Sequence, residues 1–282
     1  MYTTFIDPKD VIRRIEDPSW VVVDCRHTLA DFSAGKRMYD ESHIPGAFFA
    51  DVENELSGPK SGANGRHPMP GAAKFAEVLR GFGVDETSQI VAYDAGGDIF
   101  AARMWFLCKW IGHDAVAVLD GGFAAWTKAG YRVTNEILQR PVPGSIVAHP
   151  RPELVTDVQR VFENVESCDF TLLDARASDR YAGQNETVDP VGGHIPGARN
   201  RWFKENFDND GRIKSPQKLR AEFEAHGIPP GRIIHQCGSG VSAAVNMLAM
   251  EHAGIKGSKI YGGSWSEWIA DPARPVKTGS AP

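Results

Sequence analysis

The sequence predicts an α/β fold that occurs twice along the chain, in two halves that share one plan. The pentapeptide His43-Ile-Pro-Gly-Ala47 returns unchanged as His194-Ile-Pro-Gly-Ala198. Upstream of it, Val22-Val-Asp-Cys-Arg26 matches Leu172-Leu-Asp-Ala-Arg176 at nearly the same offset. In both halves short apolar runs alternate with helix-like stretches, a pattern typical of a mostly parallel sheet covered by helices on both faces. A repeat of this length in a chain of 282 residues indicates two tandem domains.

The apolar runs place three strands and two helices in each half. In the first half we expect strands at Trp20–Asp24, Ile90–Tyr93 and Ala115–Leu119, and helices at Ala72–Gly81 and Ala101–Gly112. In the second half we expect strands at Phe170–Leu173, Ile233–Gln236 and Lys259–Tyr261, and helices at Pro216–His226 and Ser242–Ala253. Open α/β sheets bind their ligands at the carboxyl ends of the strands, so candidate site residues are sought there.

The domain boundary is expected in a proline-rich segment. Residues 139–152 contain four prolines, which favour an extended, semi-rigid connection over a core element. The predicted organisation is therefore an N-terminal domain at residues 1–138, a linker at 139–152 and a C-terminal domain at 153–282.

The composition is that of an ordinary globular protein with a sizeable core. Hydrophobic residues make up 42% of the chain and charged residues 24%. No apolar stretch approaches the roughly 18 residues that span a bilayer, and the first residues lack the pattern of a signal peptide. We therefore expect a cytoplasmic protein without membrane contact. The formal net charge of −5 and the absence of a basic run argue against nucleic acid as a partner.

The four cysteines are too few and too far apart for a disulfide framework. Their spacing contains no CxxC and no Cys/His pattern that would indicate zinc, so reduced thiols and neither a metal nor another cofactor are expected. The four positions are Cys25, Cys108, Cys168 and Cys237.

Cys237 stands apart because it lies between a strand-like run and a helix-like run. It follows directly on Ile233–Gln236, and the apolar helix predicted downstream would point its first backbone N–H groups at the sulfur. Such a nest of amides favours negative charge, and the thiolate is the reactive form of cysteine. Gly238 and Gly240 permit backbone conformations and close ligand approach that a plain connection would not need. Cys237 is therefore the predicted nucleophile.

The first half differs at this position. Asp94 corresponds to Cys237, and the loop that follows it is about two residues longer when counted to the paired glycines downstream. The first half cannot carry out thiol chemistry there. We expect it to be a scaffold domain.

Together, the duplicated plan, the paired HIPGA motifs, the loop Cys237-Gly-Ser-Gly-Val-Ser242 and the closing Gly-Ser-Trp-Ser-Glu-Trp268 resemble the tandem-domain rhodanese family, in its 3-mercaptopyruvate and thiosulfate sulfurtransferase branches. The resemblance spans nearly the whole chain. It implies two rhodanese-like domains and an enzyme whose cysteine takes a sulfur atom from a small donor, holds it as a persulfide and passes it to an acceptor. It implies a thiol or cyanide as acceptor, with the dithiol protein thioredoxin a candidate.

The resemblance also implies roles for further residues. Ser239, His67 and Glu53 match the positions of a proton relay that would move the donor's thiol proton. The family usually has aspartate at the third position, so Glu53 is a departure, and Asp51 is the neighbouring alternative.

Substrate binding is the second role that the resemblance implies. Arg180 matches an arginine that pairs with the donor's carboxylate, as a planar guanidinium does well. The backbone of the loop, Gly238, Gly240, Val241 and Ser242, would hold the sulfur anion. A second family arginine has no counterpart, because residues 181 to 198 contain no Arg or Lys. The candidates to replace it are Arg199, Arg201 and Arg66.

The loop's charge favours one donor. Family members with Arg and Lys directly after the cysteine use thiosulfate, a dianion, whereas this loop has the neutral pair Gly238 and Ser239. We therefore expect 3-mercaptopyruvate, a monoanion, as the donor. The alternatives are a thiosulfate:cyanide sulfurtransferase and a persulfide carrier that serves a protein acceptor. A cysteine-dependent phosphatase is disfavoured, because Ala243 stands where that class usually has arginine.

Overall fold

The structure is a computed structural model that describes residues 1–97, 99–138, 142–225, 227 and 231–282. Its residues form two compact units. Unit 1 comprises Met1–Gly58, Pro70–Arg151 and Phe207–Ile213. Unit 2 comprises Pro59–Met69, Pro152–Asn206 and Lys214–Pro282. Each unit therefore takes in a short segment from the other half of the sequence.

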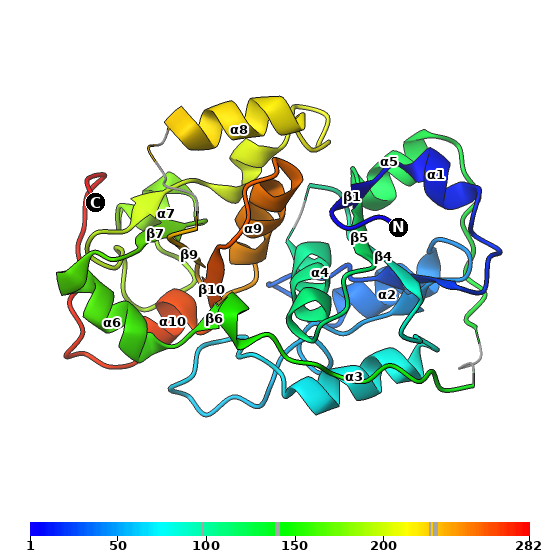
Figure 1. The fold of residues 1–282 in the computed structure, drawn as a ribbon, viewed down its shortest axis with the longest axis horizontal. Helices are drawn as coiled ribbons and strands as arrows, with labels where there is room; N and C mark the ends of the chain where they lie inside the picture. The colour runs from blue at the N-terminus through cyan, green and yellow to red at the C-terminus, as the bar shows by residue number, and fades with distance from the viewer. Residues whose placement is uncertain (98, 139–141, 226, 228–230) are drawn as a thin grey trace. The chain divides into compact units, whose positions relative to one another are not determined.

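Unit 1 contains a parallel sheet of five strands in the order β1-β5-β4-β2-β3 (Figure 1). The strands are β1 (Phe5–Ile6), β2 (Trp20–Asp24), β3 (Phe48–Phe49), β4 (Gln89–Tyr93) and β5 (Val116–Leu119). The helices are α1 (Pro8–Ile12), α2 (Ala34–Glu41), α3 (Ala72–Gly81), α4 (Phe100–Trp110) and α5 (Gly122–Lys128).

Unit 2 repeats this plan with the strand order β6-β10-β9-β7-β8. The strands are β6 (Val155–Thr156), β7 (Thr171–Asp174), β8 (Arg199–Asn200), β9 (Ile233–Gln236) and β10 (Lys259–Tyr261). The α-helices are α6 (Val158–Ser167), α7 (Ser178–Tyr181), α8 (Pro216–Ala225), α9 (Ala243–His252) and α10 (Ser264–Trp268). Two 3-10 turns lie at Pro152–Leu154 and Phe203–Asn206. The identical order of the two parallel sheets confirms the predicted duplicated α/β fold.

The residues of the sequence repeat occupy equivalent places in the two units. In unit 1 the guanidinium of Arg26 lies 2.6 Å from the Asp24 carboxylate, and in unit 2 Arg176 lies 2.6 Å from Asp174. Both pairs are buried at the carboxyl end of a central strand. The histidines of the repeated pentapeptide are also buried, and each bonds a tyrosine carbonyl through Nδ1 and stacks on that tyrosine's ring. These residues stabilise the fold in both copies.

Helices cover both faces of each sheet (Figure 1). In unit 1, apolar side chains of α1, α2 and α5 pack on one face, and α4 contacts β4 and β5. In unit 2, side chains of α6, α7 and α10 pack on one face, and α9 contacts β9 and β10. Because α8 in turn packs on α9, the side chains of α9 are almost all buried.

The predicted elements agree closely with those observed. Strands β2, β9 and β10 and helix α3 have the predicted bounds, and the other predicted elements differ by one or two residues at an end. His226, the last residue of one predicted helix, lies outside the described residues. The strands β1, β3, β6 and β8 were not predicted, because each has two residues and two residues cannot display an alternation.

The predicted linker is described from residue 142 onward, and residues 139–141 lie outside the described part. It runs extended along unit 1: Gly144 and Ile146 donate to backbone carbonyls of Arg80 and Val84. Ile146 is buried there. The predicted domain limits stay a prediction, since the two compact units are discontinuous in sequence.

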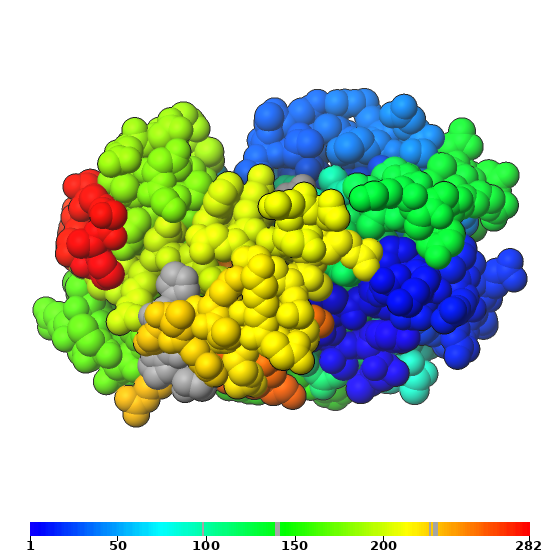
Figure 2. Space-filling model, turned by 90° about the horizontal axis from the view of Figure 1, so that it is seen from above, coloured from blue at the N-terminus to red at the C-terminus, as the bar shows by residue number. Residues whose placement is uncertain are grey.

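The surface of unit 2 and the lengths of the helices complete the description. Helix α8 and the last residues of the chain lie at the surface of unit 2, the latter drawn in red (Figure 2). None of the helices formed by the described residues is both long and apolar enough to cross a bilayer.

One buried residue makes the stability of unit 2 depend on pH. His235, in the middle of β9, is fully buried, and neither ring nitrogen has a hydrogen-bond partner among the described residues. Burial lowers its pKa to about 3. The unfolded chain protonates this side chain below about pH 6.5, whereas the folded chain does not until near pH 3. The contribution of His235 to the free energy of unfolding is therefore fully present above about pH 6.5 and is lost as the pH falls toward 3.

We predict that His235→Leu reduces this pH dependence. Between pH 7.5 and 5.0 the free energy of unfolding should fall by about 2 kcal/mol less in the variant than in the wild type. Urea unfolding at the two pH values measures the difference. The exposed His149 provides a control, His149→Leu, which should behave like the wild type. Equal pH dependence in the wild type and His235→Leu would contradict the prediction.

Candidate active site

Cys237 is the first residue after β9 and lies six residues before α9 begins. Its side chain is buried, and its Sγ accepts the backbone N–H of Gly240 at 3.1 Å. The sulfur therefore lies at the carboxyl end of a central strand and at the amino end of a ten-residue helix, where partial positive charge favours an anion.

The cysteine loop is docked on the turn that leads into α10. Ser264 Oγ accepts the N–H of Cys237 at 3.1 Å and donates to the Tyr261 carbonyl at 2.8 Å. In return, the N–H groups of Trp265 and Ser266 donate to the carbonyls of Cys237 and Gly238 at 3.0 and 2.9 Å. The loop is thereby held on both sides of the sulfur by hydrogen bonds to the turn before α10.

Both glycines of the loop are required by what lies beside them. Gly240 has φ +78, and a Cβ there would lie 2.1 Å from the Gly262 carbonyl oxygen. A Cβ at Gly238 would lie 2.8 Å from the guanidinium of Arg66. Gly240 therefore lets the loop approach the turn, and Gly238 makes room for a cation.

Ser239 and His67, two members of the predicted relay, are in direct contact. His67 Nδ1 lies 2.8 Å from Ser239 Oγ, and both side chains are buried. His67 belongs to Pro59–Met69, the segment that unit 2 takes from the first half of the sequence. The pair lies two residues along the loop from the sulfur, a suitable place for a group that moves a proton.

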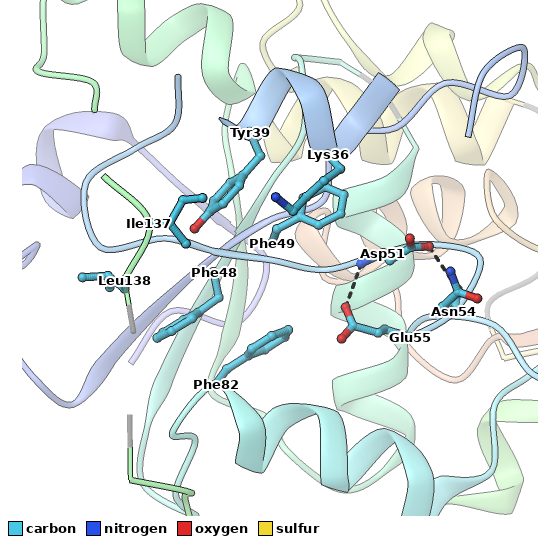
Figure 3. Close-up of a pocket in the computed structure, with 10 residues that line it drawn as sticks. All are labelled: Lys36, Tyr39, Phe48, Phe49, Asp51, Asn54, Glu55, Phe82, Ile137 and Leu138. Atoms are coloured by element: carbon cyan, nitrogen blue, oxygen red, sulfur yellow. Dashed lines mark hydrogen bonds between the residues drawn. The ribbon is translucent and has the colours of Figure 1, made fainter. Parts of the chain in front are cut away.

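Glu53 and Asp51, the candidates for the third relay position, belong to unit 1. Asp51 accepts the backbone N–H groups of Glu53 and Asn54 at 2.8 and 3.0 Å and so caps a short turn. It also lines a pocket of about 400 Å³ together with Glu55 and several aromatic rings (Figure 3). The role of Glu53 in the relay stays a prediction.

Two arginines meet above Gly238. Arg180, on α7, lies 3.2 Å from the Asp189 carboxylate and 2.9 Å from Glu186. Arg66 forms an ion pair with the other carboxylate oxygen of Asp189, and its backbone N–H donates to Ser266 Oγ at 3.0 Å. The structure therefore brings Arg66 and Arg180 together at the cysteine loop. Such a pair can bind a small carboxylate or a sulfur oxyanion.

The other two candidate arginines do not reach this place. Arg199 is exposed, and its guanidinium donates to the Gly227 carbonyl at 3.4 Å. Arg201 is buried against the Phe223 ring and pairs with Glu222 at 2.8 Å. Of the three replacements considered from the sequence, Arg66 is the one beside the loop.

Opposing effects act on the pKa values of two arginines near Cys237. Burial lowers the pKa of Arg66, the sulfur of Cys237 opposes this shift, and the like charge of Arg180 adds to it. Burial also acts to lower the pKa of Arg176, but the Asp174 carboxylate outweighs it and the pKa is raised. Both guanidinium groups are charged at neutral pH, since arginine titrates far above it.

The equivalent place in unit 1 holds a carboxylate of the protein. Asp94 follows β4 as Cys237 follows β9, and its carboxylate accepts the N–H groups of Gly96 and Ala101 at 3.1 and 3.0 Å. One amide of the loop and one of the first turn of α4 are therefore bonded to a side chain of the protein itself.

The remaining three cysteines are free thiols, and two of them pack in the interior. Cys25 and Cys108 are buried, and burial raises the pKa of each well above its ordinary value. Cys168 is exposed and ends α6 with φ 52.

Sequence reasoning missed the supporting residues of the site. Ser264 and Ser266 hold the loop and Arg66 through hydroxyl and backbone groups. Asp189 was missed as well. Its position just before Pro190 and the second pentapeptide carries no motif that would distinguish it from a surface carboxylate.

Comparison with known proteins agrees with this geometry. The family described as rhodanese-like domain matches residues 7–129 and 157–271. A probable 3-mercaptopyruvate sulfurtransferase from Pseudomonas aeruginosa is 45% identical over 271 residues, which covers 94% of this chain and 95% of that protein. Thiosulfate sulfurtransferase from Bos taurus is 36% identical over 264 residues, covering 91% and 84%.

A solved structure shows the same architecture. The 3-mercaptopyruvate sulfurtransferase from Leishmania major has a TM-score of 0.83 and 28% identity, covering 94% of this chain and 74% of that one. The substrates of such enzymes are a sulfur donor and a sulfur acceptor. Since the family matches both units and a relative is 45% identical along almost the whole chain, this protein belongs to the rhodanese family and is a sulfurtransferase.

Proposed function

We propose that this enzyme moves sulfane sulfur from 3-mercaptopyruvate to a thiol or cyanide acceptor through a persulfide on Cys237. The observation that carries the proposal is the position of the Cys237 sulfur, bonded to the Gly240 N–H in a loop beside Arg66 and Arg180. The 45% identical relative from Pseudomonas aeruginosa, a probable 3-mercaptopyruvate sulfurtransferase, supports this donor.

The chemistry proceeds in two displacements. The Cys237 thiolate attacks the donor's sulfur, an S–S bond forms, and the C–S bond breaks with its electron pair on carbon. The enolate of pyruvate then takes up a proton, and the proton of the donor's thiol balances it. In the second step an acceptor thiolate or cyanide attacks the terminal sulfur and releases Cys237 as thiolate. Thioredoxin is a suitable protein acceptor, because one of its thiols can take the sulfur as a persulfide and its second thiol can then displace that sulfur as sulfide, leaving a disulfide.

The residues around the sulfur suit each step. Loop amides, Gly240 first, stabilise the persulfide anion without moving. Arg180 and Arg66 pair with the donor's carboxylate, and Ser239 with His67 moves the thiol proton. Glu53 is the proposed acid of this relay. Val241 and Ser242, both buried, complete the loop before α9.

A thiosulfate:cyanide sulfurtransferase is the second candidate. The 36% identical thiosulfate sulfurtransferase from Bos taurus and the presence of two guanidinium groups favour it. The neutral Gly238 and Ser239 argue for the monoanionic donor. A carrier that delivers the persulfide only to a protein partner is the third candidate, distinguished by its lack of turnover with small acceptors.

We propose the cytoplasm as the compartment of this enzyme, since all four cysteines are free thiols.

We predict that Cys237→Ser abolishes sulfur transfer. Incubation with 3-mercaptopyruvate should add one sulfur atom to the intact mass of the wild type and none to the variant, because serine forms no persulfide. Pyruvate release should fall by at least about 1000-fold. Cys168→Ser, at an exposed cysteine, is the matched control and should retain both. A wild type that forms no persulfide overturns the proposal, and a strong preference for thiosulfate moves it to the second candidate.

We predict that His67→Gln and Ser239→Ala impair one donor selectively. 3-Mercaptopyruvate carries a thiol proton that must move, whereas thiosulfate carries none. The kcat/KM for 3-mercaptopyruvate should fall by about 100-fold, and that for thiosulfate by less than about 5-fold. Steady-state kinetics with both donors measures this split. Equal losses for the two donors would show that the pair only supports the loop.

We predict that Arg66→Met raises the KM for 3-mercaptopyruvate about 10- to 100-fold, the effect of losing a charged hydrogen-bonded partner. Arg180→Met should do the same. Arg199→Met removes the same charge from an exposed position and should change KM by less than about 2-fold. A similar KM in Arg66→Met and Arg199→Met would exclude Arg66 from donor binding.

A further inference from the structure

Asp189 occupies the two arginines that would receive the donor. One carboxylate oxygen pairs with Arg66 and the other lies 3.2 Å from Arg180, so a single carboxylate bridges two guanidinium groups. It lies close to the loop, because its Oδ2 would be 3.8 Å from a Cβ at Gly238. The carboxylate of a small anionic donor could bridge two guanidinium groups in the same way.

The burial of this group distinguishes it from a surface ion pair. The Asp189 side chain is 2% exposed, whereas those of Arg66 and Arg180 are 31% and 22% exposed. The carboxylate is covered while both guanidinium groups remain open to an incoming ligand. Its backbone is fixed too, since its N–H donates to the Glu186 carboxylate at 2.9 Å. Asp189 is thus held in place by the fold.

The surrounding charges cancel. Three guanidinium groups face three carboxylates within this cluster: Arg66, Arg176 and Arg180 with Asp174, Glu186 and Asp189. When Cys237 attacks the donor as a thiolate, its charge adds one negative charge to this neutral cluster. Each further negative charge on the donor meets repulsion that is weakly screened in this largely buried place.

We propose that Asp189 is a specificity-determining residue, which holds Arg66 and Arg180 together and cancels one of their charges, so that the enzyme prefers a monoanionic donor to a dianionic one. The inference rests on the proposed function, because it concerns the donor of that same site. It means that a residue outside the cysteine loop determines which donor the enzyme prefers. The neutral loop alone leaves two cations beside the sulfur, and two cations suit a dianion.

Removal of the charge should therefore change the preference between donors. In Asp189→Asn the cluster carries one uncompensated positive charge, which attracts thiosulfate twice as strongly as it attracts 3-mercaptopyruvate. We expect the ratio of kcat/KM for thiosulfate to that for 3-mercaptopyruvate to rise about tenfold, mainly through KM. The increase should shrink at 0.5 M NaCl, where screening is stronger.

Binding of product-like anions tests the same point without turnover. Titration calorimetry with sulfate and with pyruvate should show that Asp189→Asn increases the affinity for sulfate about tenfold more than that for pyruvate. If the wild type forms no persulfide from either donor, the proposed function fails, while these affinities still report on Asp189. If the anion affinities keep their wild-type ratio, the inference about Asp189 fails and the proposed function stands.

The controls separate charge from structure. Asp189→Glu keeps the charge and should keep the wild-type preference. Glu166→Gln removes one negative charge at an exposed position of α6 and should leave both ratios unchanged. Asp189→Ser, a second neutral variant, should behave like Asp189→Asn. Unchanged ratios in both neutral variants would overturn the inference, as would failure of both to fold, which would make Asp189 a structural residue.

Discussion

The active loop depends on one close backbone contact, that between Gly240 and the carbonyl of Gly262. A side chain at position 240 would lie 2.1 Å from that oxygen, so the loop and the turn before α10 fit only without it. Around this contact, Ser264 accepts the N–H of Cys237, and Trp265 donates to its carbonyl. The sulfur is therefore positioned by hydrogen bonds of the main chain of Cys237 to the turn before α10. Preorganised amides of this kind stabilise an anion with little rearrangement.

The two units show how one sheet plan gives two outcomes. In each unit a residue follows the central strand at the start of a helix, where N–H groups need an acceptor. In unit 1 Asp94 supplies that acceptor through its own carboxylate. In unit 2 Cys237 supplies sulfur, which accepts the N–H of Gly240 and can also bond to a second sulfur atom. The same place in the sheet thus holds a carboxylate bonded to amides of its own unit in one copy and a thiol in the other.

Much of this arrangement follows from the sequence, and the remainder has a physical reason. The repeat predicted the fold, and the strand-like run before Cys237 predicted that its sulfur lies at the carboxyl end of β9, because both are local patterns. The contact of His67 with Ser239 joins residues 172 positions apart, and only the folded chain brings them together. Asp189 has no local signal, since its function depends on Arg66, which is 123 residues away. Arg66 itself remained one of three candidates until the positions of all three were known.

Gly238 links the loop's neutrality to the arginines beside it. The absence of a cationic side chain in the loop suggests a site with little positive charge, but an added Cβ at Gly238 would meet the Arg66 guanidinium at 2.8 Å. The loop is small there because a cation from another segment occupies the space. A charged loop and a small loop with an arginine above it are thus two ways to place positive charge near the sulfur. In the second arrangement the cation can be partly neutralised by a fixed carboxylate such as Asp189, whereas a loop side chain carries its charge directly to the donor. Donor preference in this enzyme is therefore a property of the whole arginine and carboxylate cluster.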